Sequence, residues 1–252
     1  MTLCDQQLPS LKSLQGPFFS RDELVHLQPP KHVAIMPDGN RRWAQQRGEP
    51  HVEGYLAGTQ KLIQAALAAK ELGIGVLTMY AFSTENWKRS PDEIDLLMHL
   101  FDLHLNFYAQ SLLESDIRVH VIGKREELPL FLQETIEHVC ALTSPAKGLD
   151  FVLAINYGGR DDIVRAVNSL LQNGVQEVTE KTLHAALDTA CWPDPDLVIR
   201  TSGEKRFSNF LLWQLSYSEW LTPHKHWPDF TPHDLLLALT NYQQRSRRYG
   251  GS

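Results

Sequence analysis

The sequence predicts a single α/β domain in which a central, mostly parallel sheet is flanked by helices. Short apolar runs alternate along the chain with longer segments of helical periodicity, which is the pattern of a parallel sheet. The length of 252 residues suits one large α/β domain or two small ones, and a hydrophobic content of 42% can fill a substantial core. Several apolar runs end in polar loops, as they do where parallel sheets bind ligands.

The expected elements follow from periodicity and from turn residues. Residues 1–31 are predicted to form a loosely held arm, with a short helix opening at residues 20–23, and residues 32–252 the folded domain. A glycine-punctuated loop at 48–58 leads into a helix with an apolar stripe over 62–72, which Gly73 ends. Strands are expected at 33–36, 76–82, 117–122, 149–155, 196–199 and near 219–220, and the other helices at 91–113, 128–142, 161–172, 179–190 and 231–248.

Composition and missing motifs exclude several functions. A formal net charge of -6 argues against a general nucleic-acid binder. No apolar run reaches the roughly 18 residues of a membrane span, and the N-terminus lacks the pattern of a secretory signal. The distant Cys4, Cys140 and Cys191 indicate neither disulfides nor zinc, and they suit a reducing cytoplasm. Nucleotide binding is disfavoured because no Walker A motif is present and no GxGxxG follows a strand.

The loop after the first strand carries the strongest chemical signal. Pro37 cannot extend a sheet ladder, so the strand is expected to stop there. The loop that follows combines a carboxylate, a glycine and two guanidinium groups, which suits a metal-bound phosphate. An ordinary turn with solvated arginines explains this stretch about as well when it is considered alone. The loop residues are Asp38, Gly39, Asn40, Arg41, Arg42 and Trp43.

Similar side chains follow other strands, and together they favour a polyphosphate site. Parallel strands bring their carboxyl ends to one sheet edge, where arginine forks match phosphate oxygens. The long helix near Phe101 and the helix ending at Leu142 could form the wall of an apolar tunnel. Such a tunnel would bind an isoprenoid tail strongly, because each buried CH₂ contributes about 0.8 kcal/mol. The four strand ends offer Asp38, Asn40 and Arg42; Ser83, Asn86 and Arg89; Asn156 and Arg160; and Arg200, Arg206 and Ser208.

Four motifs resemble the cis-prenyltransferase family, and within it the bacterial undecaprenyl diphosphate synthases. They are HVAIMPDGNRRWA, YAFSTENWKRSPDE, INYGGRDDIVRA and DLVIRTSGEKRFSNFLLWQLSYSEW, followed by WPDF and RRYGG. The resemblance runs from His32 to about Gly251, so residues 32–252 would be the catalytic domain. It implies sequential condensation of isopentenyl diphosphate onto an allylic diphosphate such as farnesyl diphosphate, with cis double bonds, Mg²⁺ and a homodimer.

The resemblance also implies roles for individual residues. Asp38 would work with Mg²⁺, Glu219 would be a second Mg²⁺ ligand, and Asn86 matches the proposed site of proton abstraction. Because a neutral amide is scarcely basic, we expect Asn86 to orient a phosphate oxygen or water that takes the proton. Arg248 and Gly250 match a C-terminal end that reaches across the dimer. The substrate contacts implied are Gly39, Asn40, Arg41, Arg42, Trp43, Ser83, Thr84, Glu85, Trp87, Arg89, Arg200, Arg206, Phe207 and Ser208.

Three positions depart from the family pattern. The family usually carries arginine in place of His51, histidine in place of Tyr55 and often histidine in place of Lys205. His51 and Lys205 can still meet a phosphate, whereas Tyr55 can donate a hydrogen bond but cannot be a cation. These departures bear on the pH profile and the diphosphate affinity, and they leave the implied reaction unchanged.

The product and the cellular setting admit alternatives. Leu142 falls where a bulky family residue closes the tunnel floor, which favours a long product such as undecaprenyl diphosphate, the precursor of the lipid carrier for cell-wall glycans. A shorter-chain cis-synthase is the alternative, and a non-catalytic partner subunit or a phosphate-binding regulatory domain ranks lower, because Asp38, Arg200 and Arg206 are all present. The expected location is the cytoplasm, with transient contact at the inner membrane face and no nucleic-acid partner.

Overall fold

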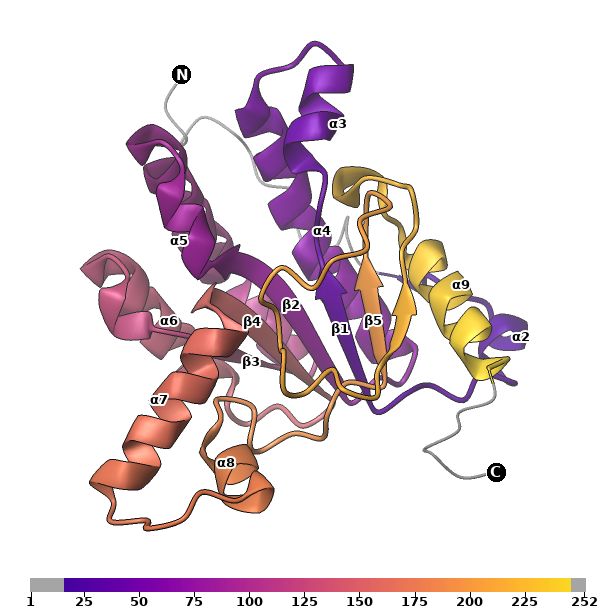
Figure 1. Cartoon of the computed structure of the whole chain (residues 1–252). Helices are drawn as coiled ribbons and strands as arrows, with labels where there is room; N and C mark the ends of the chain where they lie inside the picture. Colours follow the sequence, from indigo (N-terminus) through magenta and orange to yellow (C-terminus); the bar gives the residue numbers. More distant parts are fainter. Residues whose placement is uncertain (1–15, 246–252) are drawn as a thin grey trace.

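The computed structural model in Figure 1 describes residues 16–245. Within these residues, six strands form one sheet in the order β3-β4-β2-β1-β5-β6, and each neighbouring pair is parallel. The predicted α/β class with a parallel sheet is therefore confirmed. The strands are β1 His32–Met36, β2 Val76–Ser83, β3 Ile117–Ile122, β4 Leu149–Tyr157, β5 Leu197–Arg200 and β6 Glu219–Leu221.

The helices expected at 91–113, 128–142 and 161–172 agree with those bounds to within two residues, and other helices differ more. Ser90 and Pro91 open α5 as expected, and Thr231 caps α9 through a reciprocal pair of hydrogen bonds with Asp234. The helix expected at 179–190 ends at Ala186, and part of the extension expected to residue 248 lies outside the described residues. The helices are α2 Arg21–Leu24, α3 Asn40–Gln46, α4 His51–Glu71, α5 Pro91–Glu114, α6 Leu130–Thr143, α7 Gly159–Gln172, α8 Glu180–Ala186 and α9 Pro232–Gln243, with 3₁₀ turns η2 Thr84–Lys88, η3 Arg125–Glu127 and η4 Trp227–Asp229.

The four inner strands β4, β2, β1 and β5 send alternate side chains into two different cores. Val33 and Ile35 of β1 join the larger core, to which α4, α5, α6 and α9 contribute. Ala34 and Met36 join a second core on the opposite face, where the segment 210–215 covers the sheet. This double burial explains why the strands read as continuous apolar runs, and it leaves the carboxyl ends of the strands as the place for polar groups.

The described part of the N-terminal arm is packed against the domain. Phe19 is buried in the larger core, although residues 1–31 were expected to be loosely held. The backbone N–H groups of Phe18 and Phe19 donate to the carboxylate of Glu71 at the end of α4. Residues 16–24 are therefore attached to the domain through side-chain burial and through hydrogen bonds.

The loop expected at residues 48–58 is instead mostly helical, because α4 begins at His51. Gly54 and Gly58 lie four residues apart on one face of α4, where α3 approaches closely. A Cβ atom at Gly54 would lie 2.1 Å from the backbone oxygen of Asn40, and one at Gly58 would lie 2.7 Å from Asn40 Oδ1. These glycines therefore allow two helices to pack closely, and their spacing of four residues was the signal that the loop prediction overlooked.

We expect Gly54→Ala to destabilise the protein by about 1–3 kcal/mol, because the added methyl group collides with the backbone of α3. His51→Ala, at an exposed position of the same helix, should change the free energy of unfolding by less than about 0.5 kcal/mol. Urea denaturation of both variants measures the difference. Equal stability of the two variants would contradict this account of the α3–α4 contact.

His32, at the amino end of β1, is buried as a neutral imidazole. Its Nδ1 lies 2.6 Å from the backbone oxygen of Pro193, and its Nε2 lies 2.8 Å from Thr78 Oγ1. Because a carbonyl oxygen can only accept, the proton lies on Nδ1 and the Thr78 hydroxyl donates to Nε2. Burial lowers the pKa of His32 from 6.5 to about 4, and the bond to Pro193 offsets this effect only in part.

The lowered pKa of His32 makes stability depend on pH. Below pH 6.5 the unfolded chain takes up a proton before the folded chain does, so stability contributed by the neutral ring is lost as the pH falls towards about 4. This loss amounts to about 3 kcal/mol. We expect His32→Gln to show a correspondingly smaller fall in the free energy of unfolding across this window, measured by denaturation at each pH. Parallel pH profiles for the two proteins would contradict this.

Candidate active site

A cavity of about 580 Å³ opens at the carboxyl ends of β1, β2 and β5. Three of the four predicted strand ends contribute to it, and all three supply polar side chains. The fourth strand end, after β4, supplies none of the lining residues. Predicted site residues that line the cavity are Asp38, Asn40, Ser83, Glu85, Asn86, Arg89, Arg200, Arg206 and Ser208.

Asp38 lies between two guanidinium groups at the end of β1. Its Oδ2 accepts from Arg200 Nη2 at 2.9 Å, and its Oδ1 accepts from Arg42 Nη2 at 3.1 Å. Burial by itself would raise the pKa of Asp38, but the hydrogen bonds and charges of Arg200 and Arg42 outweigh it and leave the pKa lowered. Asp38 is therefore an ionised carboxylate at neutral pH, held in one orientation.

The backbone around Asp38 is held by the segment that follows β5. The Asp38 N–H donates to Thr201 Oγ1 at 2.7 Å, and the Asp38 carbonyl accepts from the hydroxyls of Thr201 and Ser202. Gly39 has φ 102°, and a Cβ atom there would lie 2.1 Å from Ser202 Oγ. Only glycine fits this position, because both its backbone angle and the nearby hydroxyl exclude a side chain.

Arg200 connects Asp38 to the loop after β5. It is 5% exposed, and its Nη1 donates to Ser208 Oγ at 2.8 Å and to the backbone oxygen of Arg206. Its Nε is buried and has no hydrogen-bond partner among residues 16–245. Such a donor suits an anionic ligand, because an unpaired buried N–H is costly.

Arg41, Arg42 and Trp43 of the first loop do not line the cavity themselves, and each pairs with a carboxylate. Arg42 Nη1 pairs with Glu204 at 2.9 Å, and Glu204 also binds Arg206, so one carboxylate joins two arginines. Arg41 is more exposed and lies 3.8 Å from Glu93. Trp43 donates its indole N–H to Asp229 at 2.8 Å, which attaches α3 to η4 rather than facing a ligand.

The loop after β2 presents Asn86 with a defined amide orientation. Asn86 Oδ1 accepts the backbone N–H of Ser83 at 3.1 Å in a reciprocal capping arrangement. Since that N–H can only donate, the Asn86 oxygen is used and the amide nitrogen remains as the group that can donate into the cavity. This geometry supports a role in orienting an anion or water, and it does not support a role as a base.

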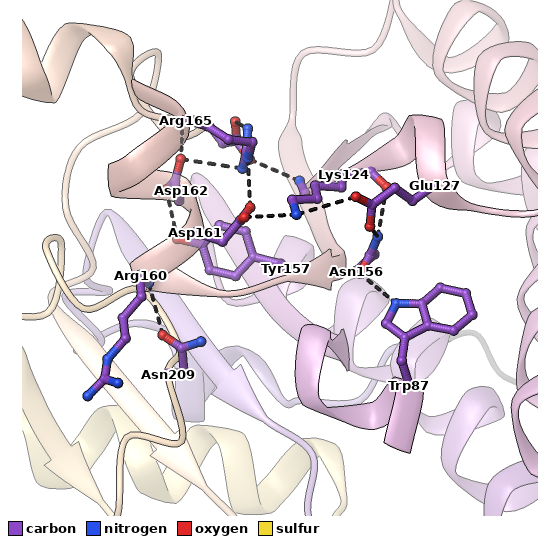
Figure 2. Close-up of polar contacts among 12 residues, drawn as sticks. Trp87, Lys124, Glu127, Asn156, Tyr157, Arg160, Asp161, Asp162, Arg165 and Asn209 are labelled. Atoms are coloured by element: carbon purple, nitrogen blue, oxygen red, sulfur yellow. Dashed lines mark hydrogen bonds and ion pairs between the residues drawn. The ribbon is translucent and has the colours of Figure 1, made fainter. Parts of the chain in front are cut away.

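The neighbours of Asn86 are held by other segments. Glu85 Oε1 accepts from Asn209 Nδ2 at 2.8 Å, and Thr84 lies against Gly158. Trp87 donates its indole N–H to Asn156 Oδ1 at 2.7 Å, as Figure 2 shows. Asn156 therefore points into the protein and holds η2, although it was expected to face the ligand.

Arg89 joins the cavity through a small polar cluster at the start of α5. Its Nη1 donates to Glu93 Oε1 at 2.9 Å and to the hydroxyl of Tyr55 at 3.1 Å. Tyr55 lines the cavity and donates its own hydroxyl proton to Glu93. The tyrosine at this departure from the family pattern thus remains part of the site as a neutral hydrogen-bonding group.

Glu219 and Phe207 are two of the predicted site residues that do not line the cavity; the others are Gly39, Arg41, Arg42, Trp43, Thr84 and Trp87. Glu219 of β6 lies opposite Leu197, at the start of β5. Leu197 precedes Arg200 by three residues, so Glu219 lies about 10 Å from the level of Arg200 along the strand direction. Its carboxylate accepts from Arg245 Nη1 at 2.6 Å. Phe207 stacks edge-on against Trp220 at 4.7 Å. The described chain therefore does not bring Glu219 to Asp38, as a shared metal site within one chain would require.

Several lining or bridging residues were missed from the sequence. Tyr80 stacks on Phe210 with ring centroids 4.4 Å apart and lines the cavity, and Asn209 lines it as well. Glu93 follows Arg89 by four residues on a helix, a spacing that predicts their ion pair. Glu204 lies within the quoted SGEKR stretch. Tyr80 likewise opens the quoted YAFSTENWKRSPDE motif, and Asn209 lies in the same quoted motif as Glu204.

An apolar pocket adjoins the polar cavity between α4 and α5. The two share Asn40, Tyr55 and Tyr80 among their lining residues, and the pocket has a volume of about 40 Å³. Its apolar wall includes Leu62, Leu97, Phe101 and Trp227. The predicted apolar role of the long helix near Phe101 is thus consistent with this geometry, whereas Leu142 is not among the lining residues.

Two general observations concern metals and membranes. Among residues 16–245, no group of three or more histidine, cysteine, aspartate and glutamate side chains is placed to hold a metal ion. In the same part of the chain, no helix is both long enough and apolar enough to span a bilayer. Cys140 and Cys191 are free thiols there.

The parallel α/β sheet thus carries carboxylate and arginine side chains at its strand ends, beside an apolar pocket. A family model described as a putative undecaprenyl diphosphate synthase matches residues 35–250. The chain belongs to this family of prenyltransferases.

Relatives with names and known structures support this assignment. The chain is 43% identical over 228 residues to an isoprenyl transferase of Bacillus anthracis, covering 88% of each chain. It is 45% identical over 228 residues to that of Brucella abortus, covering 88% of this chain and 90% of the relative. A crystal structure of lavandulyl diphosphate synthase from Lavandula x intermedia, in complex with dimethylallyl diphosphate, matches with a TM-score of 0.83 at 38% identity, covering 88% of this chain and 99% of that one.

A second solved structure extends the comparison to a bacterial protein. The probable undecaprenyl diphosphate synthase of Campylobacter jejuni matches with a TM-score of 0.74 at 33% identity. The alignment covers 89% of this chain and 100% of that one. Both the fold class and the family resemblance inferred from the motifs are thereby confirmed.

Proposed function

We propose that this chain condenses isopentenyl diphosphate sequentially onto an allylic diphosphate, with farnesyl diphosphate as the primer. The proposed product is a long-chain cis-polyprenyl diphosphate, undecaprenyl diphosphate, the precursor of the lipid carrier for cell-wall glycan synthesis. The observation that carries the proposal is the Asp38–Arg200–Arg42 cluster in a polar cavity that adjoins an apolar pocket.

The cavity offers two neighbouring sets of anion-binding groups. Arg200, Arg206 and Ser208 come from the loop after β5, and we assign them to the diphosphate of isopentenyl diphosphate. Asp38, Asn40 and Arg42, with Gly39, Arg41 and Trp43 beside them, form the side proposed for the allylic diphosphate. Guanidinium groups bind phosphate oxygens bidentately, and they stabilise the charge that builds on a leaving diphosphate. The allylic C–O bond then breaks while a C–C bond to the isopentenyl double bond forms.

The residues present fit Mg²⁺ bound together with a diphosphate. Asp38 lines the cavity as an ionised carboxylate, and Mg²⁺ is commonly held by one or two carboxylates with substrate phosphate oxygens and waters. When bound, Mg²⁺ would supply Lewis-acid stabilisation of the leaving diphosphate. Glu219 as a second ligand stays a prediction, and the distance along β5 does not favour it within one chain.

The loop after β2 would guide loss of the proton. The Asn86 amide nitrogen can donate to a diphosphate oxygen, which is a better proton acceptor than the amide itself. Ser83, Thr84, Glu85 and Trp87 would fix this loop, and Arg89 would add a cation beside it. Phe207 is proposed as a contact at the outer end of the second diphosphate site.

A shorter product is the alternative that a specific observation favours. The solved lavandulyl diphosphate synthase holds dimethylallyl diphosphate, a short allylic diphosphate, on a closely similar fold. A non-catalytic partner subunit is less well supported, because Asp38, Arg42 and Arg200 are all present and ion-paired. The size of the product distinguishes the long-chain from the shorter-chain hypothesis. Activity of the purified chain by itself would reject the hypothesis of a non-catalytic partner subunit.

The experiment incubates the purified full chain with farnesyl diphosphate, labelled isopentenyl diphosphate and Mg²⁺, beside an EDTA control. A Mg²⁺-dependent series of extended products ending at one long cis-polyprenyl diphosphate is expected. Products that stop after one or two additions would replace the long-chain proposal with the shorter-chain one. A folded protein that extends no primer would reject the proposed reaction.

A homodimer and a transient membrane contact complete the proposal. The motif matched by Arg248 and Gly250 lies outside the described residues, and β6 is the outer strand of the described sheet. Light scattering of the purified protein tests the dimer, and a monomer at assay concentrations would reject it.

Membrane contact is motivated by the apolar product, and failure of the product-loaded enzyme to sediment with anionic vesicles would contradict it. A cytoplasmic location stays a prediction.

A further inference from the structure

Asn209 lies where three strand-end segments meet. Its Nδ2 donates to Glu85 Oε1 at 2.8 Å in η2, and its Oδ1 accepts the backbone N–H of Arg160 at 2.9 Å at the start of α7. Its own carbonyl accepts the N–H of Gly159 at 2.6 Å. Figure 2 shows the Asn209 amide facing the beginning of α7 beside Arg160. One side chain thus joins the loops that follow β2, β4 and β5.

The surroundings of Asn209 specify this residue type. The Arg160 N–H can only donate, so the amide oxygen faces α7 and the amide nitrogen faces the carboxylate of Glu85. Its backbone has φ 63°, a left-handed conformation that asparagine tolerates better than most residues. A Cβ atom at Gly158 would lie 2.7 Å from Asn209 Nδ2, so glycine there leaves the space that the amide occupies.

The segments that Asn209 joins carry different parts of the proposed reaction. Ser208 is the neighbour of Asn209 in the chain, and its hydroxyl accepts a hydrogen bond from Arg200 Nη1 at 2.8 Å. Both residues belong to the proposed binding site for the diphosphate of isopentenyl diphosphate. Glu85 precedes Asn86 in η2, which would orient the group that takes the proton. The hydrogen bond to Asn209 acts with others to lower the pKa of Glu85, although burial opposes this. Glu85 is therefore an ionised acceptor that a neutral N–H donor fits and a second carboxylate would repel.

We propose that Asn209 is a positioning residue that fixes η2, and with it Asn86, relative to the diphosphate-binding loop after β5. This inference rests on the proposed prenyl transfer. Asn209 acts through Glu85, and its effect is on turnover, because a loop displaced by about 1 Å can cost about 10²-fold in rate.

The test is a double-mutant cycle between Asn209 and Glu85. Asn209→Asp keeps the acceptor for Arg160 but places a second carboxylate against Glu85, so kcat should fall by about 10²-fold. In the Asn209→Asp/Glu85→Gln protein, the glutamine amide can donate to the new carboxylate, so kcat should return to within a few fold of Glu85→Gln alone. Asn173→Asp, at an exposed helix end, adds the same charge as a control and should leave kcat unchanged.

Five outcomes decide the inference. Rescue in the double variant, with thermal midpoints of all variants close to that of the wild type, would support it. Additive losses, or a loss of kcat matched by a loss of folded protein, would reduce Asn209 to a structural residue and overturn it. Full activity of Asn209→Asp would also overturn it. An inactive but folded wild type would reject the proposed function itself and the inference with it.

Discussion

Asp38→Ala is expected to lower prenyl transfer by at least about 10³-fold, the largest effect of any single substitution. The carboxylate accepts from both Arg200 and Arg42, so its removal leaves two cations without their shared partner and takes away the proposed Mg²⁺ ligand. Loss of even one group that stabilises transition-state charge costs about 10²–10³-fold. Turnover of farnesyl diphosphate and isopentenyl diphosphate at saturating Mg²⁺ measures the effect.

The control for this prediction is Asp95→Ala. The Asp95 side chain is 75% exposed on α5 and lies outside the cavity, so the variant should keep wild-type turnover. Asp38→Asn adds a second comparison, because it retains the shape of the side chain while removing its charge. Near-normal activity of Asp38→Asn would show that the charge of Asp38 is dispensable and would remove it from the catalytic group.

Arg200→Lys is expected to raise the KM for isopentenyl diphosphate by about 10²-fold. The guanidinium reaches Asp38, Ser208 and the Arg206 backbone at the same time, and an ammonium group cannot reproduce that planar arrangement. Charge-assisted hydrogen bonds contribute about 1.5–3 kcal/mol each, so losing one or two accounts for the change. Steady-state kinetics with the isopentenyl diphosphate concentration varied provides the measurement.

The KM for the allylic substrate shows whether Arg200→Lys weakens one diphosphate site or disturbs the whole active site. The KM for farnesyl diphosphate should change much less, because Arg200 is assigned to the other diphosphate. Arg118→Lys, an exposed position on β3, controls for the substitution type and should leave both KM values unchanged. Equal increases in both KM values for Arg200→Lys would contradict the assignment of this arginine to one substrate.

The fold was predictable because its signals are local. The four inner strands are buried on both faces, so they appear in the sequence as short apolar runs, and the pairs Ser90–Pro91 and Thr231–Asp234 mark helix starts. The error at residues 48–58 has the same origin. Gly54 and Gly58 suggest a loop locally, and only the approach of Asn40 from α3 explains them as a helix contact.

The candidate site was predictable in composition and less so in arrangement. Asp38, Arg42 and Arg200 could be grouped because parallel strands place their ends together. The direction of a side chain at a strand end depends on distant partners, however. Asn156 hydrogen-bonds to the Trp87 indole and the Lys124 carbonyl, and Trp43 donates to Asp229. No spacing in the chain reveals these contacts. Strand register likewise separates Glu219 from the cavity.

The ion pair between Asp38 and Arg200 spans 162 positions of the sequence. During synthesis at about 5–20 residues per second, β1 therefore emerges from the ribosome long before β5. The edge of β1 that pairs with β5 stays unpaired for most of the translation time. An unpaired apolar strand is a template for pairing between chains. We therefore expect nascent chains that stop before Leu197 to be inactive and prone to aggregation, so that this enzyme acquires its active site only near the end of its own synthesis.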